Sequence, residues 1–191
     1  MESTLVLWLS GAAVTLLTLV LVLWLRRRGR GENLADALQS IGIASRTDVT
    51  VPDGNGGLIH LEHLIFTAKG VIVLDVKSVD GIVFASDSME EWTTIATRRR
   101  YTFRNPQPAL LDRVAAVKLV AKDIPVSGHV VFMSGADFSK GRPAHVIQPK
   151  ELVERYGKPS HAELERVIEA FSPQWEQLID ICEPSFKLAA N

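Results

Sequence analysis

Two apolar segments separated by a short turn dominate the middle of the chain. Leu58 to Phe66 is rich in apolar and β-favouring residues, and Val71 to Val76 is a nearly continuous apolar run. The first segment predicts a strand, and the second predicts a strand that is buried on both faces. Because Gly70 marks a turn between them, we expect the two strands to pair as a hairpin about residues 67–70.

Other patterns along the chain favour an α/β fold. Helical spacing and end signals predict helices at 32–41, 108–120 and 149–156, with Leu110, Leu111, Val114 and Val117 facing inward on the second. A capping box at Ser160 predicts a further helix, which Pro173 should break before a last amphipathic helix. Short strands are predicted at 49–51, 82–85, 92–95, 130–133 and 144–147. Since sequential hairpins argue against an all-parallel sheet, we expect a mixed central sheet flanked by helices.

The N-terminal segment has the pattern of a membrane anchor. Leu5 to Leu25 contains no charged residue and is long enough to span a bilayer, with Trp8 and Trp24 near its ends. Glu2 precedes it without any Lys or Arg, which favours a retained anchor over a cleaved signal peptide. The arginines from Arg26 onward predict a single-pass protein of the inner (plasma) membrane with a cytoplasmic C-terminal domain. We therefore divide the chain into an anchor at 1–28 and a domain at 29–191.

Charge and cysteine content limit what this domain does. The chain has 21 Lys and Arg residues against 22 Asp and Glu, a formal net charge of −1. A domain that binds long nucleic acids is usually basic, so any nucleic-acid binding here depends on a local basic patch. Cys182 is the single cysteine, which excludes an intrachain disulfide and is compatible with a reducing compartment.

Charged residues on the two strands of the central hairpin are the candidate metal-binding and catalytic residues. Asp75 and Lys77 close the second strand and lie two residues apart, so their side chains share a face. Glu62 is the carboxylate of the first strand, and hairpin pairing brings it near Asp75. Neighbouring carboxylates repel unless a cation lies between them, and hard oxygen ligands bind Mg²⁺ or Mn²⁺. The alternative is a surface hairpin with an ordinary Asp-Lys pair at its end.

A series of short motifs surrounds these residues in a fixed order. They are Gly31-Glu32, Glu62-His63-Leu64-Ile65, Gly70, Asp75-Val76-Lys77, Gly81, Trp92 and Asn105-Pro106. The series resembles the nuclease-related domain (NERD) family of the PD-(D/E)xK nuclease superfamily, from about Gly31 to about Val120. Three positions depart from the family pattern: Glu62 and Asp75 exchange the usual Asp and Glu, and Ala109 stands where the family has a glutamine.

The resemblance implies a restriction-endonuclease-like fold and metal-dependent hydrolysis of nucleic-acid phosphodiesters, in DNA or RNA. Glu62 and Asp75 would hold Mg²⁺ or Mn²⁺, joined by Glu32, and Lys77 would position the attacking water. The alternative reason for Glu32 is the helix dipole alone, because a carboxylate in the first turn of a helix is favoured by it. His60 shares a strand face with Glu62, which leaves it as a further candidate ligand. The rival function is a membrane-tethered binding or scaffolding module that has kept the fold and lost the chemistry.

A basic cluster is the candidate contact to nucleic-acid phosphates. It consists of Arg98, Arg99, Arg100 and Arg104. If the segment is extended, Arg98, Arg100 and Arg104 share a face opposite to Tyr101 and Phe103. If residues 97–99 form a hairpin tip, the first three arginines crowd there instead. A solvated strand edge that is kept charged against aggregation is the alternative to phosphate binding.

Overall fold

The computed structural model describes residues 34–97, 99–157 and 159–185. The helices are α2 (Leu34–Ile41), α3 (Gln107–Val120), α4 (Pro149–Tyr156) and α5 (His161–Ile181). The strands are β1 (Gly42–Pro52), β2 (Leu58–Thr67), β3 (Gly70–Lys77), β4 (Gly81–Phe84), β5 (Glu91–Ala96), β6 (Arg99–Arg104), β7 (Val126–Phe132), β8 (Ala136–Asp137), β9 (Val146–Ile147) and β10 (Glu183–Pro184). The predicted anchor at 1–28 and Glu32 lie outside the described residues, and none of the described helices is long and apolar enough to cross a membrane.

The central sheet is mixed, as the sequence predicts. Its strand order is β10-β1-β2-β3-β7-β9. The β1, β2 and β3 strands are antiparallel, whereas β3, β7 and β9 run parallel. The predicted hairpin is confirmed, because β2 pairs with β3 from Thr67↔Gly70 to His63↔Leu74. The parallel neighbour of β3 is reached only after β4, β5, β6 and the crossover helix α3, so distant sequence segments gather at the C-terminal end of β3.

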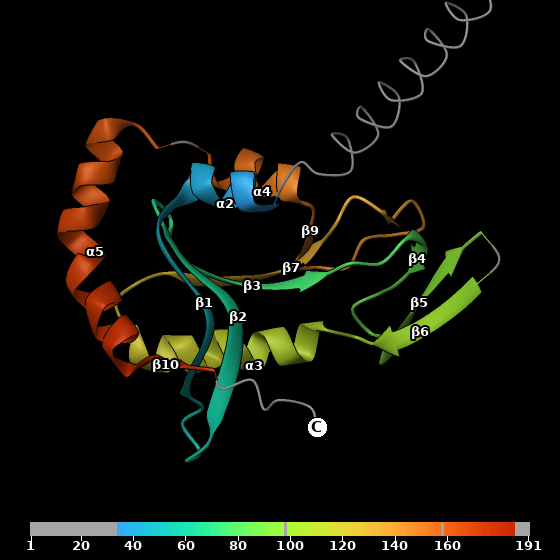
Figure 1. Ribbon diagram of the computed structural model, residues 1–191, viewed down its shortest axis with the longest axis horizontal. Helices are drawn as coiled ribbons and strands as arrows, with labels where there is room; N and C mark the ends of the chain where they lie inside the picture. The colour runs from blue at the N-terminus through green and yellow to red at the C-terminus, as the bar shows by residue number, and fades with distance from the viewer. Residues whose placement is uncertain (1–33, 98, 158, 186–191) are drawn as a thin grey trace, which may run out of the picture.

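Helices cover both faces of the central sheet (Figure 1). On one face, Ile72 and Leu74 of β3 pack in a core cluster with Leu152 of α4 and Ile41 of α2. On the other face, Val73 belongs to a larger cluster that includes Leu110 of α3. Alternation along β3 therefore sends Asp75 and Lys77 to the face covered by α3.

A second mixed sheet extends beyond the C-terminal end of β3, with the order β6-β5-β4-β8 (Figure 1). Trp92 of β5 is fully buried and packs its ring near those of Phe103 and Phe132. These aromatic contacts attach the second sheet to β7 of the central sheet. The sequence predicts β4 and β5 as strands, but not that they form a separate sheet.

Gly70 is required by the turn that starts β3. Its φ is +106°, a backbone conformation that side-chain-bearing residues rarely adopt. A Cβ at this position would lie 2.2 Å from the carbonyl oxygen of Pro125. This close approach allows Val71 to donate its backbone N–H to the same carbonyl at 2.9 Å, which fixes the start of β3 against the segment entering β7.

Three local predictions are wrong. The helix α5 continues through Pro173, because the buried Trp175 and Leu178 hold its second half on the core despite the hydrogen bond that proline removes. Leu111 is 47% exposed, since the buried stripe of α3 runs through Leu110, Val114 and Val117. The strand β1 has 11 residues rather than the predicted three, because its exposed polar half is held by pairing with β2 and shows no apolar pattern.

Candidate functional site

The candidate site lies at the C-terminal end of β3, where Asp75 is buried. Its exposed fraction is only 6%, whereas Lys77, two residues further on, is half-buried. Both side chains belong to the face of the sheet that α3 covers. A carboxylate in this position loses most of its hydration, so it needs a compensating partner.

Glu62 lies beside Asp75, as the hairpin predicts. The register His63↔Leu74 places Glu62 opposite Asp75 at the next position along the two strands. The Glu62 Oε2 atom accepts a hydrogen bond of 2.8 Å from the Val76 backbone N–H, which fixes the carboxylate at the end of β3. The two acids are close enough that the charge on Glu62 raises the pKa of Asp75. The structure therefore brings together the two carboxylates that the sequence singled out.

Arg113 of α3 is a site residue that the sequence reading missed. Its Nη1 donates to Asp75 Oδ2 at 3.0 Å, and its Nε donates to the His60 carbonyl oxygen at 2.7 Å. The signal available was its position: Arg113 lies three residues after Leu110 and directly before Val114, at the edge of the buried stripe of α3. A cation there, on the helix that crosses over β3, is placed to meet a buried carboxylate.

The pKa of Asp75 is raised above its usual value, and burial is the largest cause. The positive charge of Arg113 opposes this rise, and the negative charge of Glu62 adds to it. The Lys77 ammonium is a smaller opposing influence. Burial thus disfavours the charged form of Asp75 more than the neighbouring cations favour it, and a cation bound beside the carboxylate would lower its pKa.

A cleft of about 800 Å³ opens from Asp75 and Lys77 toward the second sheet. Asp80 lies in the loop after β3, Arg113 and Ala109 come from α3, and β6 supplies the opposite wall. The residues of β6 that line the cleft are Arg99, Tyr101, Phe103 and Arg104. Glu62 is not among the residues that line this cleft, and its carboxylate is held by the Val76 backbone N–H.

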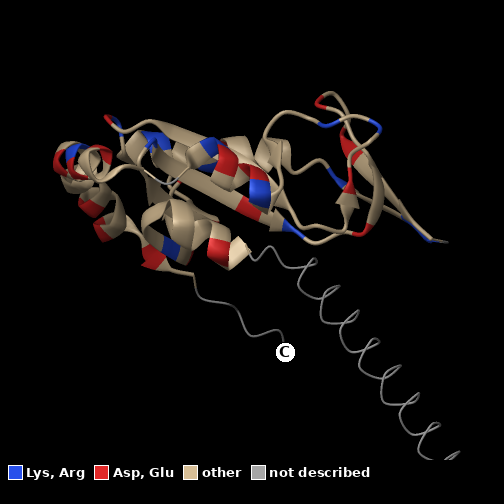
Figure 2. Cartoon of the chain, turned by 90° about the horizontal axis from the view of Figure 1, so that it is seen from above, with Lys and Arg blue, Asp and Glu red and all other residues tan. Residues whose placement is uncertain are grey.

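The basic cluster is divided between the two faces of the β5–β6 hairpin. The register Ala96↔Arg99 and Thr94↔Tyr101 puts Arg99 and Tyr101 on the same face of the hairpin, whereas Arg100 pairs with Ile95 on the opposite face. Arg104 ends β6 and lines the cleft. Figure 2 shows basic residues toward the far end of this hairpin. Arg98 lies outside the described residues. The extended alternative is therefore the one observed for residues 99–104, and among the described arginines Arg99 and Arg104 line the cleft.

Other polar residues near the site have structural partners elsewhere. His60 Nε2 lies 3.4 Å from Asp48 Oδ1 at an exposed position on β1 and β2. Gln107 is buried and donates its amide to Asp87 and to the Ala144 carbonyl, so it ties two loops together and does not line the cleft. Ala109, at the position of the expected glutamine, does line it but offers no polar side-chain atom.

The donor set at the site fits a divalent cation that takes few protein ligands. Among the described residues, no group of three or more His, Cys, Asp or Glu side chains is placed to hold a metal ion. Glu62 and Asp75 supply two carboxylates, which suits Mg²⁺, because this ion usually keeps several waters and binds through one or two carboxylates and substrate phosphates. Arg113 donates to Asp75 Oδ2, so a metal ion bound there would share or replace that contact.

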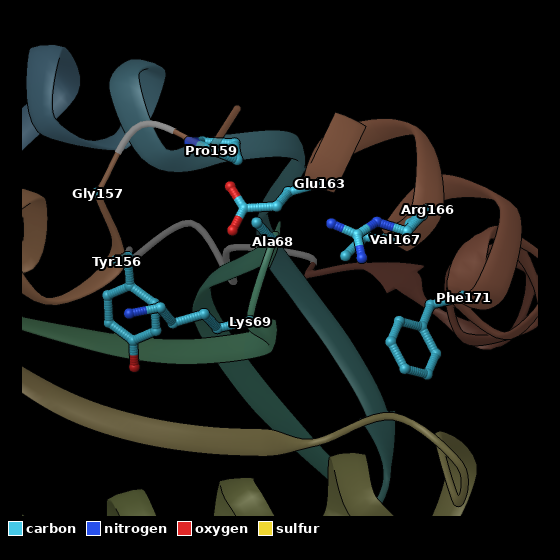
Figure 3. A pocket seen from close by; sticks show the side chains of 9 residues that line it. All are labelled: Ala68, Lys69, Tyr156, Gly157, Pro159, Glu163, Arg166, Val167 and Phe171. Carbon is cyan, nitrogen blue, oxygen red and sulfur yellow. The ribbon is translucent and has the colours of Figure 1, made fainter. Parts of the chain in front are cut away.

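A second cavity, of about 520 Å³, lies at the opposite end of β3 (Figure 3). Its polar groups already have partners within the chain. Lys69 Nζ donates to the Arg155 carbonyl oxygen, and Glu163 accepts from the backbone N–H and hydroxyl of Ser160. The Tyr156 hydroxyl lies 2.7 Å from His129 Nε2. These groups form hydrogen bonds at helix ends and in the core. We therefore take the cleft at Asp75, and not this cavity, as the candidate functional site.

The candidate site lies within the part of the chain that a protein-family model matches. The model of the family described as nuclease-related domain matches residues 28–133, which include β2, β3, α3 and the basic β6. An uncharacterized protein of Bacillus anthracis is 24% identical over 86 residues, a stretch that covers 44% of this chain and 41% of that protein. The chain thus spans less than half the length of that relative, and no solved structure matches it. Because the family match extends over more than half of the chain and contains the whole Glu62–Asp75–Lys77 hairpin, the chain belongs to the nuclease-related domain (NERD) family.

Proposed function

We propose that the chain is a metal-dependent nuclease that hydrolyses nucleic-acid phosphodiesters in the cleft at the end of β3. The observation that carries the proposal is the arrangement of the cleft: it joins Asp75 and Lys77 to Arg99 and Arg104 on the facing strand. Metal-dependent hydrolysis of a phosphodiester needs carboxylates that hold the metal ion and positively charged side chains that contact the phosphate. The family match supports the same class of function.

Each residue has a role that follows from its place in the cleft. Asp75 and Glu62 would hold Mg²⁺ or Mn²⁺, which when bound polarises a phosphoryl oxygen and acidifies a bound water. Lys77 lines the cleft, where its ammonium would orient the attacking water and stabilise charge on the phosphate. The water loses one proton to solvent as its oxygen forms a bond to phosphorus, the bond from phosphorus to the leaving sugar oxygen breaks, and that oxygen takes up a proton from solvent. Glu32 is proposed as an additional acid from the sequence alone, since it lies outside the described residues.

A second candidate function is a tethered binding module without turnover. The observation that favours it is the Asp75–Arg113 contact, because the guanidinium already supplies a positive charge to the buried carboxylate. Under this function the basic wall still binds an anionic partner, but the acid pair holds no metal. The two functions differ in metal binding and in cleavage, and both are measurable.

We also propose that the domain is held at the cytoplasmic face of the inner membrane. The support is the uncharged segment 5–25 followed by the arginine run at 26–28. A reporter enzyme that works only in the cytoplasm should be active when it is fused to the C-terminus. A C-terminus exposed outside the cell, or a shortened mature form released from the membrane, would contradict this orientation.

Substitutions of Asp75 and Lys77 should separate metal binding from cleavage. Asp75→Asn removes a charged oxygen ligand and should abolish Mn²⁺ binding in calorimetry as well as cleavage. Lys77→Ala leaves both carboxylates in place, so Mn²⁺ should still bind while cleavage falls by about 100-fold or more. The matched control is Lys69→Ala, a lysine at the other end of β3, which should leave both measurements unchanged. Absence of Mn²⁺ binding and of cleavage of single- and double-stranded DNA and RNA by the unaltered protein would discard the nuclease function.

Arg99 should contribute to phosphate binding and Arg100 should not. The two arginines are adjacent on β6 but lie on opposite faces of the hairpin, so Arg100→Ala is a matched control for charge. Arg99→Ala should weaken binding to all sequences and lower the slope of log K against log salt by roughly 0.7 to 0.9, the value for one phosphate contact. Equal slopes for the two variants would assign the arginines to solubility of the strand edge instead.

A further inference from the structure

Tyr101 is an exposed aromatic side chain inside the candidate site. It is 60% exposed, although it lies on the face of the β5–β6 hairpin that lines the cleft. Its ring stacks on that of Phe103, with centroids 5.9 Å apart and an angle of 20° between the planes. Phe103 in turn packs against the fully buried Trp92 and Phe132. A rigid aromatic base therefore supports Tyr101 from one side and leaves much of its surface open.

The charges around Tyr101 indicate what this surface would bind. Arg99 and Arg104 line the same cleft from the strand that carries Tyr101, and Lys77 and Arg113 line it from the opposite side. Against these four cations stand the carboxylates of Asp75 and Asp80 among the lining residues. The combination of basic groups with an exposed ring fits a ligand that has both anionic groups and flat aromatic groups. An unpaired nucleotide has both, because its phosphate is charged and its base is unstacked.

The position of Tyr101 is not explained by folding or by protection of the sheet edge. The strand β6 is the edge of the second sheet, and exposed arginines discourage edge-to-edge pairing. An exposed tyrosine has the opposite tendency, since it adds apolar surface to the edge. Thr102, the next residue, is exposed on the other face and shows that a small polar side chain is accommodated in this strand.

We propose that Tyr101, supported by Phe103, is a stacking platform for an unpaired nucleobase whose phosphate lies between Arg99 and Lys77. This inference rests on the proposed function and names its substrate class: single-stranded nucleic acid, or an unpaired end of a duplex. A base inside a duplex is already stacked on both sides and cannot reach the ring without being unpaired. Phosphate contacts are shared by both substrate forms, so the ring is the element that discriminates between them.

The test is equilibrium binding by the full chain, with EDTA present to prevent cleavage. The probes are a fluorescent single-stranded oligodeoxythymidylate and a closed DNA hairpin with the same number of phosphates. Base–aromatic stacking contributes about 1–3 kcal/mol per base, so Tyr101→Ala should weaken single-strand binding by about 5- to 100-fold. Binding of the closed hairpin should change by less than about twofold, and Tyr101→Phe should keep the affinity of the unaltered chain. Thr102→Ala is the matched control on the opposite face and should change neither affinity.

Several results would overturn the stacking platform. They are an unchanged single-strand affinity in Tyr101→Ala, an equal loss for both probes, or competition by polyglutamate as effective as that by the unlabelled oligonucleotide. If Arg99→Ala weakens both probes while Tyr101→Ala changes neither, the platform fails and the proposed phosphate-binding function stands. If the unaltered chain binds neither probe, the platform fails, and the proposed function is decided separately by Mn²⁺ binding and by cleavage in the presence of Mn²⁺.

Discussion

The site depends on one constraint: the carboxylate of Asp75 is buried at the end of a core strand and needs a positive charge. Removing an ionised group from water costs several kcal/mol unless opposite charge or hydrogen bonds compensate. Arg113 supplies one such contact from α3, and Lys77 adds a weaker influence from the same strand. Burial and Glu62 nevertheless keep the pKa of Asp75 above its usual value, so the compensation is incomplete. The fold thus keeps two neighbouring carboxylates at the end of a core strand, which is the basis for the metal site proposed here.

The hairpin and its acids could be predicted from the sequence because they depend on local patterns. Apolar runs set β2 and β3, Gly70 sets the turn, and strand alternation then fixes the face of Asp75 and Lys77. Arg113 could not be predicted in the same way, because its contact depends on how the crossover from β3 to β7 seats α3 on the sheet. Pro173 shows the same limit, since packing of α5 on the core overrides a local helix breaker.

The second sheet turns the end of β3 into a cleft. Without β5 and β6, Asp75 and Lys77 would lie at the open C-terminal end of β3. The aromatic contacts of Trp92 and Phe103 hold the hairpin so that Arg99 faces the acids and Arg100 faces away. This division explains how a chain with a formal net charge of −1 presents a basic surface where phosphate binding is proposed. The arginine cluster is visible in the sequence, but its division between two faces depends on where the hairpin turns.

The most direct test of the metal site is calorimetric titration of Mn²⁺ into the unaltered protein and into Arg113→Met. The methionine keeps much of the apolar stem of arginine and removes the charge that contacts Asp75, and circular dichroism checks that the fold is retained. If the Arg113 guanidinium occupies the position that a metal ion would take beside Glu62 and Asp75, the variant should bind Mn²⁺ about tenfold or more tightly. Each tenfold corresponds to about 1.4 kcal/mol of binding free energy. No Mn²⁺ binding by either protein, or equal affinities, would contradict a metal site at Glu62 and Asp75 with which Arg113 competes.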